Sequence, residues 1–537
     1  MVGARVLAGG WRDFTQGDGW GMMLGTVDRQ GSLFGVESLL CGLFDDDESS
    51  FYARMAEHGS GLIRDEDFAD CYSAGMGRPS IPPSLLMRAV LLQLRDDVSD
   101  REAARRAAKD LDWKRALGID VDVVPFHATT LSVFRSRLLI NDADGRVLKV
   151  TLGRAVGAKL FPKKVLALVD STGVMGAAAV ADTYELVRQA IAKVINSGGG
   201  AEALPKKLRR RARGVVAGKA KIDWADAGVR RGELGRLVSV ARSVLDATAD
   251  NAGLAEAREL LERIVDQDID AEPDDGQGPA IRRGVAKDRV VSVVDPEMRH
   301  GRKSRSQRVD GYKAHIITDH DNELVLGVAT TAANVADGPQ AAGLVAAAKA
   351  AGVPVAEVLG DTAYGDGDTR QAVEHVGAKV TAKTQPPAST GRFLKTDFVV
   401  DPDGLSATCP AGHTTTTETG WSTDRKGRRV VVLKFGDRCT GCHLREQCTA
   451  AKSGRMITLN FHERRLQAAR ADQARASTRR KLRRRPLVER KIAELKMHGL
   501  GKARYRGSRK NLLQLRLTAG LVNMKKLFTL ETGLAHA

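Results

Sequence analysis

Long apolar runs are missing from this sequence. No stretch approaches the roughly 20 consecutive apolar residues that a membrane-spanning helix needs, and the first residues, MVGARVLAGGWRDF, lack the long apolar core of a secretion signal. Internal repeats are missing as well. These absences argue against a membrane protein and against a repeat array, and we expect the protein to act in the cytoplasm without membrane contact.

Acidic residues are too few to balance the basic ones. The 537 residues include 84 Lys and Arg but 66 Asp and Glu, which gives a formal net charge of +18. The excess is concentrated between Arg464 and Lys510, where 18 basic residues accompany three acidic ones, a local excess of 15. Nucleic acid is the commonest polyanionic partner of such a chain. The alternative is a basic but otherwise ordinary enzyme.

The length allows two to four domains. Residues 1–50, with many Gly and an acidic cluster, are expected to be weakly structured, and residues 51–160 are expected to form short helices. In SDREAARRAA, Ser99 and Glu102 fit a capping box at a helix start. Short helices with exposed Arg are compatible with a helix-turn-helix DNA-binding domain, and equally with a plain helical bundle.

Strand patterns begin at residue 161 and continue to residue 385. KVLALVDSTG is followed by a helical insertion at about 178–287, and then by the expected strands RVVSVVD, GYKAHIITD and ELVLGVATT. A helix and a further strand lead to Asp361. Strands mixed with a crossover helix indicate an α/β core that contains a parallel pair. Residues 386–460 combine short β-like pieces with a Cys cluster, and residues 461–537 are helical and basic.

Four of the expected strands end on an aspartate. Most such residues form turns or caps, but open α/β sheets also hold their ligands at strand ends. Two carboxylates that the fold brings together can bind Mg²⁺ through hard oxygen ligands. Two such ions stabilise the entering and leaving oxygens of a phosphodiester displacement. The four residues are Asp170, Asp295, Asp319 and Asp361.

The basic region offers a third carboxylate in RRRPLVERKIAELKMHG. Pro486 suits the first turn of a helix, in which Val488, Ile492 and Leu495 would form a buried stripe. Glu489 lies beside that stripe among Arg and Lys side chains, which suits a place where DNA phosphate meets a metal ion. The alternative is a helix face of salt bridges four residues apart.

The spacing of Arg485, Glu489 and Lys496 resembles the Y-(2)-R-(3)-E-(6)-K signature of a large group of bacterial insertion-sequence DDE transposases, although Leu482 stands at the Tyr position. LVDSTG and LGDTAYGDGDTR resemble the two Asp motifs of that family. DPEMRHGRKS, GYKAHIITD and GKARYRGSRKN extend the resemblance over nearly all of residues 79–527. Family members have an RNase H-like mixed-sheet catalytic core.

The resemblance implies an enzyme that cleaves and joins DNA at the ends of an insertion element by two-metal-ion chemistry with Mg²⁺ or Mn²⁺. Its partners would be the terminal inverted repeats and target DNA, and we expect a homo-oligomer, first of all a dimer. An inactive or domesticated DNA-binding protein and a nuclease of the same fold are the alternatives. Asp295 and Asp319 are assigned to structure. The implied catalytic metal ligands are Asp170, Asp361 and Glu489, and the implied DNA contacts are Arg485, Lys496, Arg504, Arg506 and Arg509.

Cysteine is scarce, with six residues, but four of them lie within one 40-residue window. In a reducing compartment such a cluster favours metal binding over disulfides. A CxxC pair is typical of structural zinc, and we expect a zinc-binding, β-rich insertion; unligated thiols are the alternative. The expected zinc ligands are Cys409, Cys439, Cys442 and Cys448, with His413 and His443 as possible substitutes.

Overall fold

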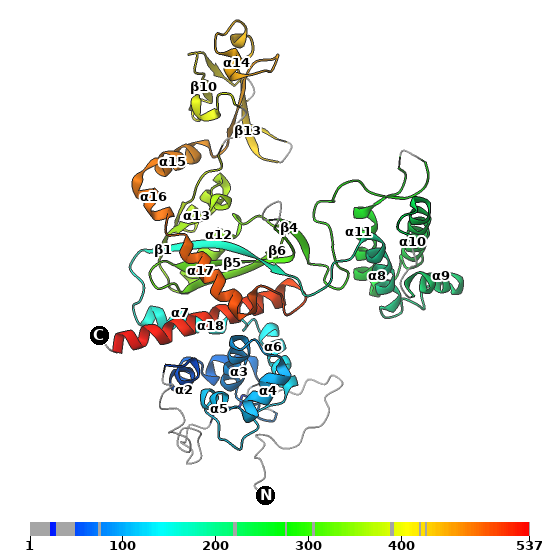
Figure 1. The fold of residues 1–537 in the computed structure, drawn as a ribbon, viewed down its shortest axis with the longest axis vertical. Coiled ribbons are helices and arrows are strands. Elements are labelled where there is room, and N and C mark those ends of the chain that lie inside the picture. The colour runs from blue at the N-terminus through cyan, green and yellow to red at the C-terminus, as the bar shows by residue number, and fades with distance from the viewer. Residues whose placement is uncertain are drawn as a thin grey trace.

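The computed structural model describes residues 22–27, 49–73, 77–217, 223–273, 276–302, 307–386, 391–417, 420–424 and 427–535. Most of the segment 1–50, expected to be weakly structured, lies outside these ranges. Within the described ranges, no helix is long and apolar enough to cross a membrane. Figure 1 shows a central body of strands and helices, a helical domain beside it, and two inserted units that extend away from the body in different directions.

The N-terminal domain is helical. A buried polar centre joins its helices, because the Asp96 carboxylate accepts hydrogen bonds from Tyr52, Arg106 and Trp113 on three other helices. Ser99 caps the helix that follows by accepting from the backbone N–H of Glu102. The helices are α2 (Phe51–Leu62), α3 (Pro83–Arg95), α4 (Asp100–Lys109), α5 (Leu111–Leu117) and α6 (Ala128–Ile140), with a 3-10 turn at Asp65–Cys71.

The central sheet is mixed. Its order is β4-β5-β1-β7-β8, and β6 also pairs with β5. Strand β5 runs antiparallel to β1, β4 and β6, whereas β1, β7 and β8 are parallel to one another. The expected α/β core with a parallel pair is therefore confirmed as a mixed sheet. The strands are β1 (Val165–Met175), β4 (Arg299–Arg302), β5 (Arg308–Asp319), β6 (Val325–Ala332), β7 (Val355–Leu359) and β8 (Lys379–Thr381).

Helices cover both faces of the sheet. Along β1 successive side chains point to opposite faces: Ala167 and Val169 pack with α7 (Arg146–Gly157), α12 (Gln340–Ala350) and α13 (Gly367–His375). Leu168 lies on the other face and packs with Val488, Ile492 and Leu495 of α17 (Pro486–Leu495). The apolar stripe expected for this helix is thus buried against β1.

The last helix, α18 (Ser508–Ala535), joins the helical domain to the sheet. Leu513, Leu517 and Leu521 belong to the core of the N-terminal domain, whereas Ala519 packs with the sheet on its α12 face and Leu515 packs with α17. Helix α18 is buried on several sides, so the N-terminal domain and the sheet both pack against this one long helix (Figure 1).

The first insertion is a helical unit between β1 and β4. Its buried residues form a separate apolar core, in which Val187, Leu237 and Leu261 from three helices meet. The helices are α8 (Thr183–Asn196), α9 (Lys206–Val216), α10 (Ala227–Ala247) and α11 (Ala255–Asp268), with a 3-10 turn at Ala252–Leu254 and a small ladder of β2 (Ile269–Asp270) with β3 (Ala280–Ile281).

The second insertion follows β8 and carries the Cys cluster on short strands. Two three-stranded sheets form it, β11-β10-β9 and β12-β13-β14, and a long basic helical segment leads from it back to the core. Its elements are β9 (Val399–Asp401), β10 (Ser406–Thr408), β11 (Thr414–Thr416), β12 (Ser422–Thr423), β13 (Arg429–Lys434), α14 (Arg445–Cys448) and β14 (Met456–Asn460), with 3-10 turns at Lys395–Asp397 and Gly436–Cys439. The segment that follows is α15 (Glu463–Ala474) and α16 (Ala476–Leu482).

Two expectations about strands are wrong. RVVSVVD forms no strand, because the backbone N–H and C=O of Val290 bond to the side-chain amide of Gln267 instead of a neighbouring strand. Strand β1 does not end at Asp170 but continues to Met175 opposite β5. Gly173 fits there because Val309 occupies the space that a Cβ atom would need.

Candidate active site

The parallel ladder between β1 and β7 sets the positions of Asp170 and Asp361. Leu168 pairs with Leu359, so two residues further along, Asp170 and Asp361 come to neighbouring positions, because side chains repeat every second residue on one face of a sheet. The side chain of Asp170 is 14% exposed. Asp361 begins the 3-10 turn at Thr362–Tyr364, where its carboxylate accepts from the N–H of Ala363 at 2.8 Å.

The start of helix α17 lies near the same edge, and a basic and an acidic residue occur there one turn apart. A guanidinium nitrogen of Arg485, the residue that precedes the helix, lies 3.7 Å from the Asp170 carboxylate. Buried Val488 holds the helix against the sheet. Glu489 follows Arg485 by four residues and therefore lies on the same side of the helix, with its side chain exposed. Among the described residues, no three carboxylate, His or Cys side chains are close enough to share a metal ion as they stand.

Tyr364 is a buried residue at this edge that the sequence did not single out. Burial raises the pKa of its hydroxyl above the usual range, and the charges of Asp337, Asp170 and Asp361 raise it further, whereas Arg485 lowers it. Tyr364 therefore lies within electrostatic reach of all four charged groups. Its hydroxyl has no hydrogen-bond partner in the part of the chain that the structure describes.

Asp337 adds a carboxylate that sequence patterns did not reveal. It lies in the loop before α12, and its oxygen accepts from Lys313 of β5 at 2.9 Å. His315, two residues along the same strand, is fully buried with Nδ1 3.8 Å from Asp337. Burial lowers the pKa of His315 to about 4, although Asp337 opposes the shift. A loop Asp followed by Gly and Pro resembles an ordinary turn, so only the tertiary structure identifies it.

Asp295 and Asp319 serve the fold in this structure. The buried Asp295 accepts from the Tyr312 hydroxyl at 2.7 Å and from the N–H of Gly507. Asp319 accepts from the N–H groups of Asn322 and Leu324 and so closes the turn between β5 and β6. Burial raises the pKa of Asp319, against these hydrogen bonds.

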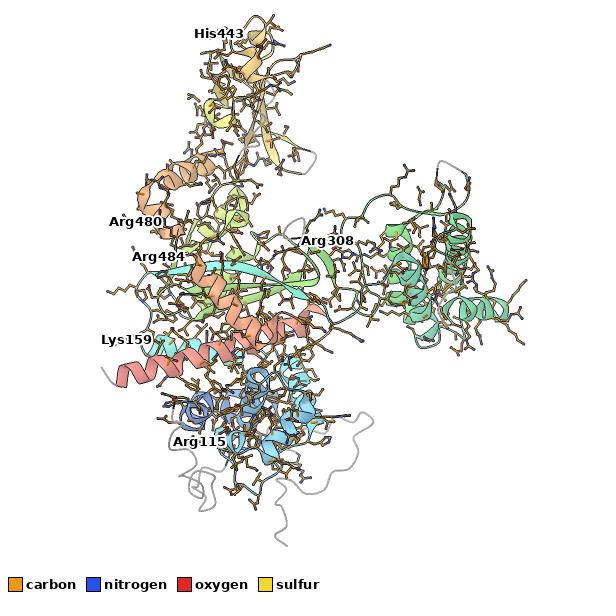
Figure 2. The ribbon with its side chains drawn as sticks, in the orientation of Figure 1. Arg115, Lys159, Arg308, His443, Arg480 and Arg484 are labelled. Carbon is orange, nitrogen blue, oxygen red and sulfur yellow. The ribbon has the colours of Figure 1, made fainter. Side chains whose placement is uncertain are left out.

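The basic residues between Arg464 and Lys510 fall into two sets. The first set forms ion pairs within the protein: Arg465 pairs with Glu374, and Lys481 pairs with Glu357. A second set has no ion pair or side-chain hydrogen bond to any described residue, and Figure 2 shows two of its members, Arg480 and Arg484, on the outer side of the segment that leads to α17. The members are Arg479, Arg480, Arg483, Arg484, Lys496, Lys502, Arg506 and Lys510.

The predicted DNA contacts divide between the same two sets. Arg504 pairs with Asp97 and donates to the carbonyl of Val98, and Arg509 pairs with Asp142 and with buried Asp144, so both connect the C-terminal segment to the N-terminal domain. Lys496 and Arg506 are exposed. Lys496 and Lys502 line a cleft of about 520 Å³ that runs beside the turn between α3 and α4.

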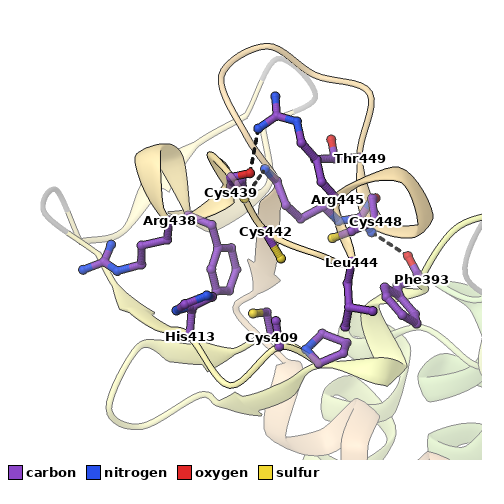
Figure 3. A pocket seen from close by; sticks show the side chains of 14 residues that line it. Phe393, Cys409, His413, Arg438, Cys439, Cys442, Leu444, Arg445, Cys448 and Thr449 are labelled. Atoms are coloured by element: carbon purple, nitrogen blue, oxygen red, sulfur yellow. Dashed lines mark hydrogen bonds between the residues drawn. The ribbon is translucent and has the colours of Figure 1, made fainter.

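The four clustered Cys line a single small cavity of about 20 Å³, together with His413 (Figure 3). Burial raises the pKa of the Cys448 thiol, Arg455 opposes the shift, and the other three thiols raise it further, so the four sulfurs lie within electrostatic reach of one another. Cys439 Sγ accepts from the N–H of Arg455 at 3.4 Å. His443 is absent from the lining and lies at the far tip of the insertion (Figure 2).

Comparison with known families matches two parts of the chain. Residues 408–528 match a family model described as a transposase DDE domain, and residues 45–137 match one described as a transposase domain. The first match contains Arg485, Glu489 and the four clustered Cys, whereas Asp170 and Asp361 lie outside both. No curated protein and no solved structure matches the chain.

The fold and these matches define the class of the protein. A mixed α/β sheet with a helical N-terminal domain carries a transposase DDE domain at its C-terminal end. Together the two matches support an insertion-sequence DDE transposase.

Proposed function

We propose that this transposase cleaves DNA at the ends of its insertion element and joins them to target DNA, with Asp170, Asp361 and Glu489 as its catalytic carboxylates. The observation that carries the proposal is the ladder between β1 and β7, which brings two carboxylates from distant parts of the sequence to one edge of the sheet. A mixed sheet with this parallel ladder supports an RNase H-like core. Arg485 lies beside Asp170, and Glu489 follows it by one helical turn, which supports Glu489 as the third carboxylate.

The donor set at this edge fits a hard divalent cation. Carboxylate oxygens are the ligands that Mg²⁺ and Mn²⁺ prefer, and Asp361 and Glu489 are accessible to solvent. The Arg485 guanidinium next to Asp170 indicates that the site already attracts positive charge. When bound, divalent ions would stabilise the charge that develops on the phosphodiester oxygens.

The chain's own residues position the DNA. Arg485 lies beside Asp170 and can hold the phosphate that flanks the cleaved bond through its planar guanidinium. The eight cations without a partner among the described residues precede and follow α17 along the chain, and they would neutralise further phosphates. The proposed DNA partners are the terminal inverted repeats and target DNA, and a homodimer that pairs two element ends is the proposed acting form.

The Cys-rich insertion is proposed to hold one structural zinc ion. Thiolates are the ligands that zinc prefers in closed structural sites, and four of them line one small cavity. His413 lines the same cavity and could replace one Cys, whereas His443 is not among the residues that line it. Small movements of the thiols would be needed, since no three of the described ligand side chains are gathered at one point as they stand.

The test combines cleavage and binding. Purified protein is incubated with its own element ends and Mg²⁺, nicks are mapped on gels, and binding is measured separately without divalent metal. Replacing Asp170 or Asp361 by Asn, or Glu489 by Gln, should remove cleavage below detection and leave DNA affinity nearly unchanged, because an amide has almost the same shape but lacks the charge that holds the ion.

The matched control is Asp295→Asn, which changes a strand-region aspartate that the fold uses internally. We expect it to keep measurable cleavage. Normal cleavage by Asp361→Asn together with an inactive Asp295→Asn would show that the site has been assigned to the wrong carboxylates. If the unmodified protein binds the ends but never nicks them, an inactive DNA-binding protein would replace the proposed enzyme, and nicking without joining would indicate a nuclease.

A further inference from the structure

Helix α9 of the helical insertion has an unusual distribution of charge. Its buried side is apolar, with Leu208, Ala212 and Val215 packed against the insertion core. Its outer side consists almost entirely of exposed cations, and no acidic residue occurs in the helix. The exposed cations are Lys206, Lys207, Arg210, Arg211 and Arg213.

These cations do not stabilise the helix that carries them. Lys206 and Lys207 occupy the first turn, where the helix dipole favours acidic residues and disfavours basic ones. Lys206 with Arg210, and Lys207 with Arg211, are like charges four residues apart, a spacing that destabilises a helix. Requirements of folding alone would not select this pattern, but binding of an anion would relieve the repulsion.

Other cations of the same insertion form ion pairs with carboxylates. Lys193 pairs with Glu256, and Arg236 pairs with Glu233. By contrast, the five exposed cations of α9 have no ion pair or side-chain hydrogen bond to any residue within the described ranges. The helix therefore presents a surface of unneutralised charge, and Figure 1 shows it on the side of the insertion that faces away from the sheet.

The position of the insertion relates this surface to the candidate active site. Strand β1 continues for five residues beyond Asp170 to Met175, and the chain then enters α8 at Thr183. Five strand residues span about 17 Å, so the base of the insertion lies about half a DNA helical turn from Asp170 and α9 lies further out. A duplex that leaves the catalytic edge in this direction would approach α9.

We propose that the exposed face of α9 is a second DNA-binding surface, which holds the phosphate backbone of duplex DNA about one to two helical turns from the cleaved position. The inference rests on the proposed function, because it takes DNA at the catalytic edge as its starting point. In this proposal the Lys and Arg side chains contact phosphates, which position the protein on the duplex but carry no sequence information.

The test compares two variants that lose the same charge. The α9 variant replaces Lys206, Lys207, Arg210 and Arg211 by Gln, which keeps a good helix former at each position. The control variant replaces four exposed lysines near the opposite end of β1 by Gln, namely Lys149, Lys159, Lys163 and Lys164. Circular dichroism and thermal unfolding establish that both variants are folded.

Binding is measured by fluorescence anisotropy, without divalent metal, over a range of salt concentrations. One duplex extends about 10 base pairs on each side of the cleaved position, and two others extend about 30 base pairs into the element or into the flanking DNA. For one of the long duplexes, the α9 variant should bind about tenfold more weakly, and the slope of log affinity against log salt should fall by about two, which corresponds to two lost phosphate contacts. The control variant should change less than twofold.

The long duplex that the α9 variant binds more weakly shows whether α9 holds element DNA or flanking DNA, and either result supports the proposal. Equal loss in both variants would overturn it, because the effect would then come from total charge. Unchanged binding of every duplex would overturn it too, and a change of oligomeric mass without a change in DNA affinity would show that α9 contacts protein. Failure of the proposed function is separate, since it would appear as an absence of nicking by the unmodified protein.

Discussion

The helical insertion between β1 and β4 and the Cys-rich insertion between β8 and α15 interrupt the same α/β core, yet they differ in what holds them together. The helical insertion has a large apolar core drawn from four helices. The Cys-rich insertion has a small core of strand residues around Phe398 and Phe435, and buried Cys448 is part of it. A unit with so little apolar core depends on cross-links or metal.

The bases of the two insertions are nevertheless similar. Where the helical insertion leaves and rejoins the core, Asp268 is paired with Arg289 and accepts from the Thr183 hydroxyl. At the base of the Cys-rich insertion, Glu463 is paired with Lys395, which also donates to the carbonyl of Thr458. In each case a buried carboxylate joins the entering and leaving chains, so the difference between the two units lies in their interiors.

Removing metal should produce the largest difference in stability between the two insertions. Chelation, or Cys442→Ser, should unfold the Cys-rich insertion, because structural zinc sites contribute apparent binding energies on the order of 10 kcal/mol. The helical insertion should be unaffected. Hydrogen exchange followed by mass spectrometry would show loss of protection in β13 and β14 with unchanged protection in α8 and α10.

Metal content provides the companion measurement. Purified protein should contain about one zinc per chain, as expected for a single closed tetrahedral site, and Cys442→Ser should contain much less. Protection of β13 and β14 that survives both the chelator and the substitution would mean that the small apolar core is sufficient and that the two insertions are held together in the same way.

The ion pair at the base of the helical insertion should have the next largest effect. Asp268→Asn leaves Arg289 without its charged partner in a largely buried position, and breaking such a pair typically costs about 3 kcal/mol. Exchange of α8 and α11 amides should accelerate accordingly, whereas the Cys-rich insertion should not respond. Arg236→Gln, which breaks an exposed pair in the same insertion, is the control and should change stability by less than about 1 kcal/mol.

The sequence predicted the core better than it predicted the ends of its strands. GYKAHIITD, ELVLGVATT and the strand before Asp361 were recognised because apolar runs with β-branched residues are typical of buried strands. RVVSVVD has the same composition but is not a strand, since Gln267 satisfies the backbone of Val290 from a distant helix. Residues 171–175 pair with β5, but the Ser, Thr and Gly among them give no apolar pattern from which a strand can be predicted.

The candidate site was predictable only in part, for a related reason. Asp170, Asp361 and Glu489 occur in motifs whose spacing along the chain is informative. Asp337 and Tyr364 have no such spacing: Asp337 lies in a turn-like loop and Tyr364 in the short 3-10 turn at Thr362–Tyr364. We connect them with the site because the charges of Asp337, Asp170 and Asp361 all act on the Tyr364 hydroxyl. This arrangement depends on the packing of several elements and cannot be read from the sequence.

Acid should weaken the base of the Cys-rich insertion. Burial raises the pKa of Glu463. The hydrogen bond and charge of Lys395 and the hydrogen bond from Arg470 lower it by more, so the pKa in the folded protein lies below the usual value. A carboxyl group with a lowered pKa stabilises the fold above its unfolded pKa of about 4.3 and loses this contribution as pH falls through the folded value. Protection of β14 should therefore stay constant from pH 7 to about 5 and fall below about pH 4.

Glu463→Gln supplies the matched control for this titration. Because Gln cannot ionise, the part of the acid response that belongs to position 463 should disappear, and protection at neutral pH should already be lower. An unchanged pH profile in Glu463→Gln would assign the acid response to another group.

The smallest expected effect concerns a single helix cap in the helical insertion. The Asp182 carboxylate accepts from the N–H of Glu185 at 2.9 Å and so caps α8. Asp182→Ala should cost about 1 kcal/mol, measured as faster exchange in α8, whereas Asp182→Ser should restore most of the protection because Ser is also a good cap. The α8 core residues remain buried in both variants, so the insertion should stay folded. A loss of several kcal/mol would show that the apolar core contributes less than we infer, and that the helical insertion, like the Cys-rich one, relies on a few polar contacts.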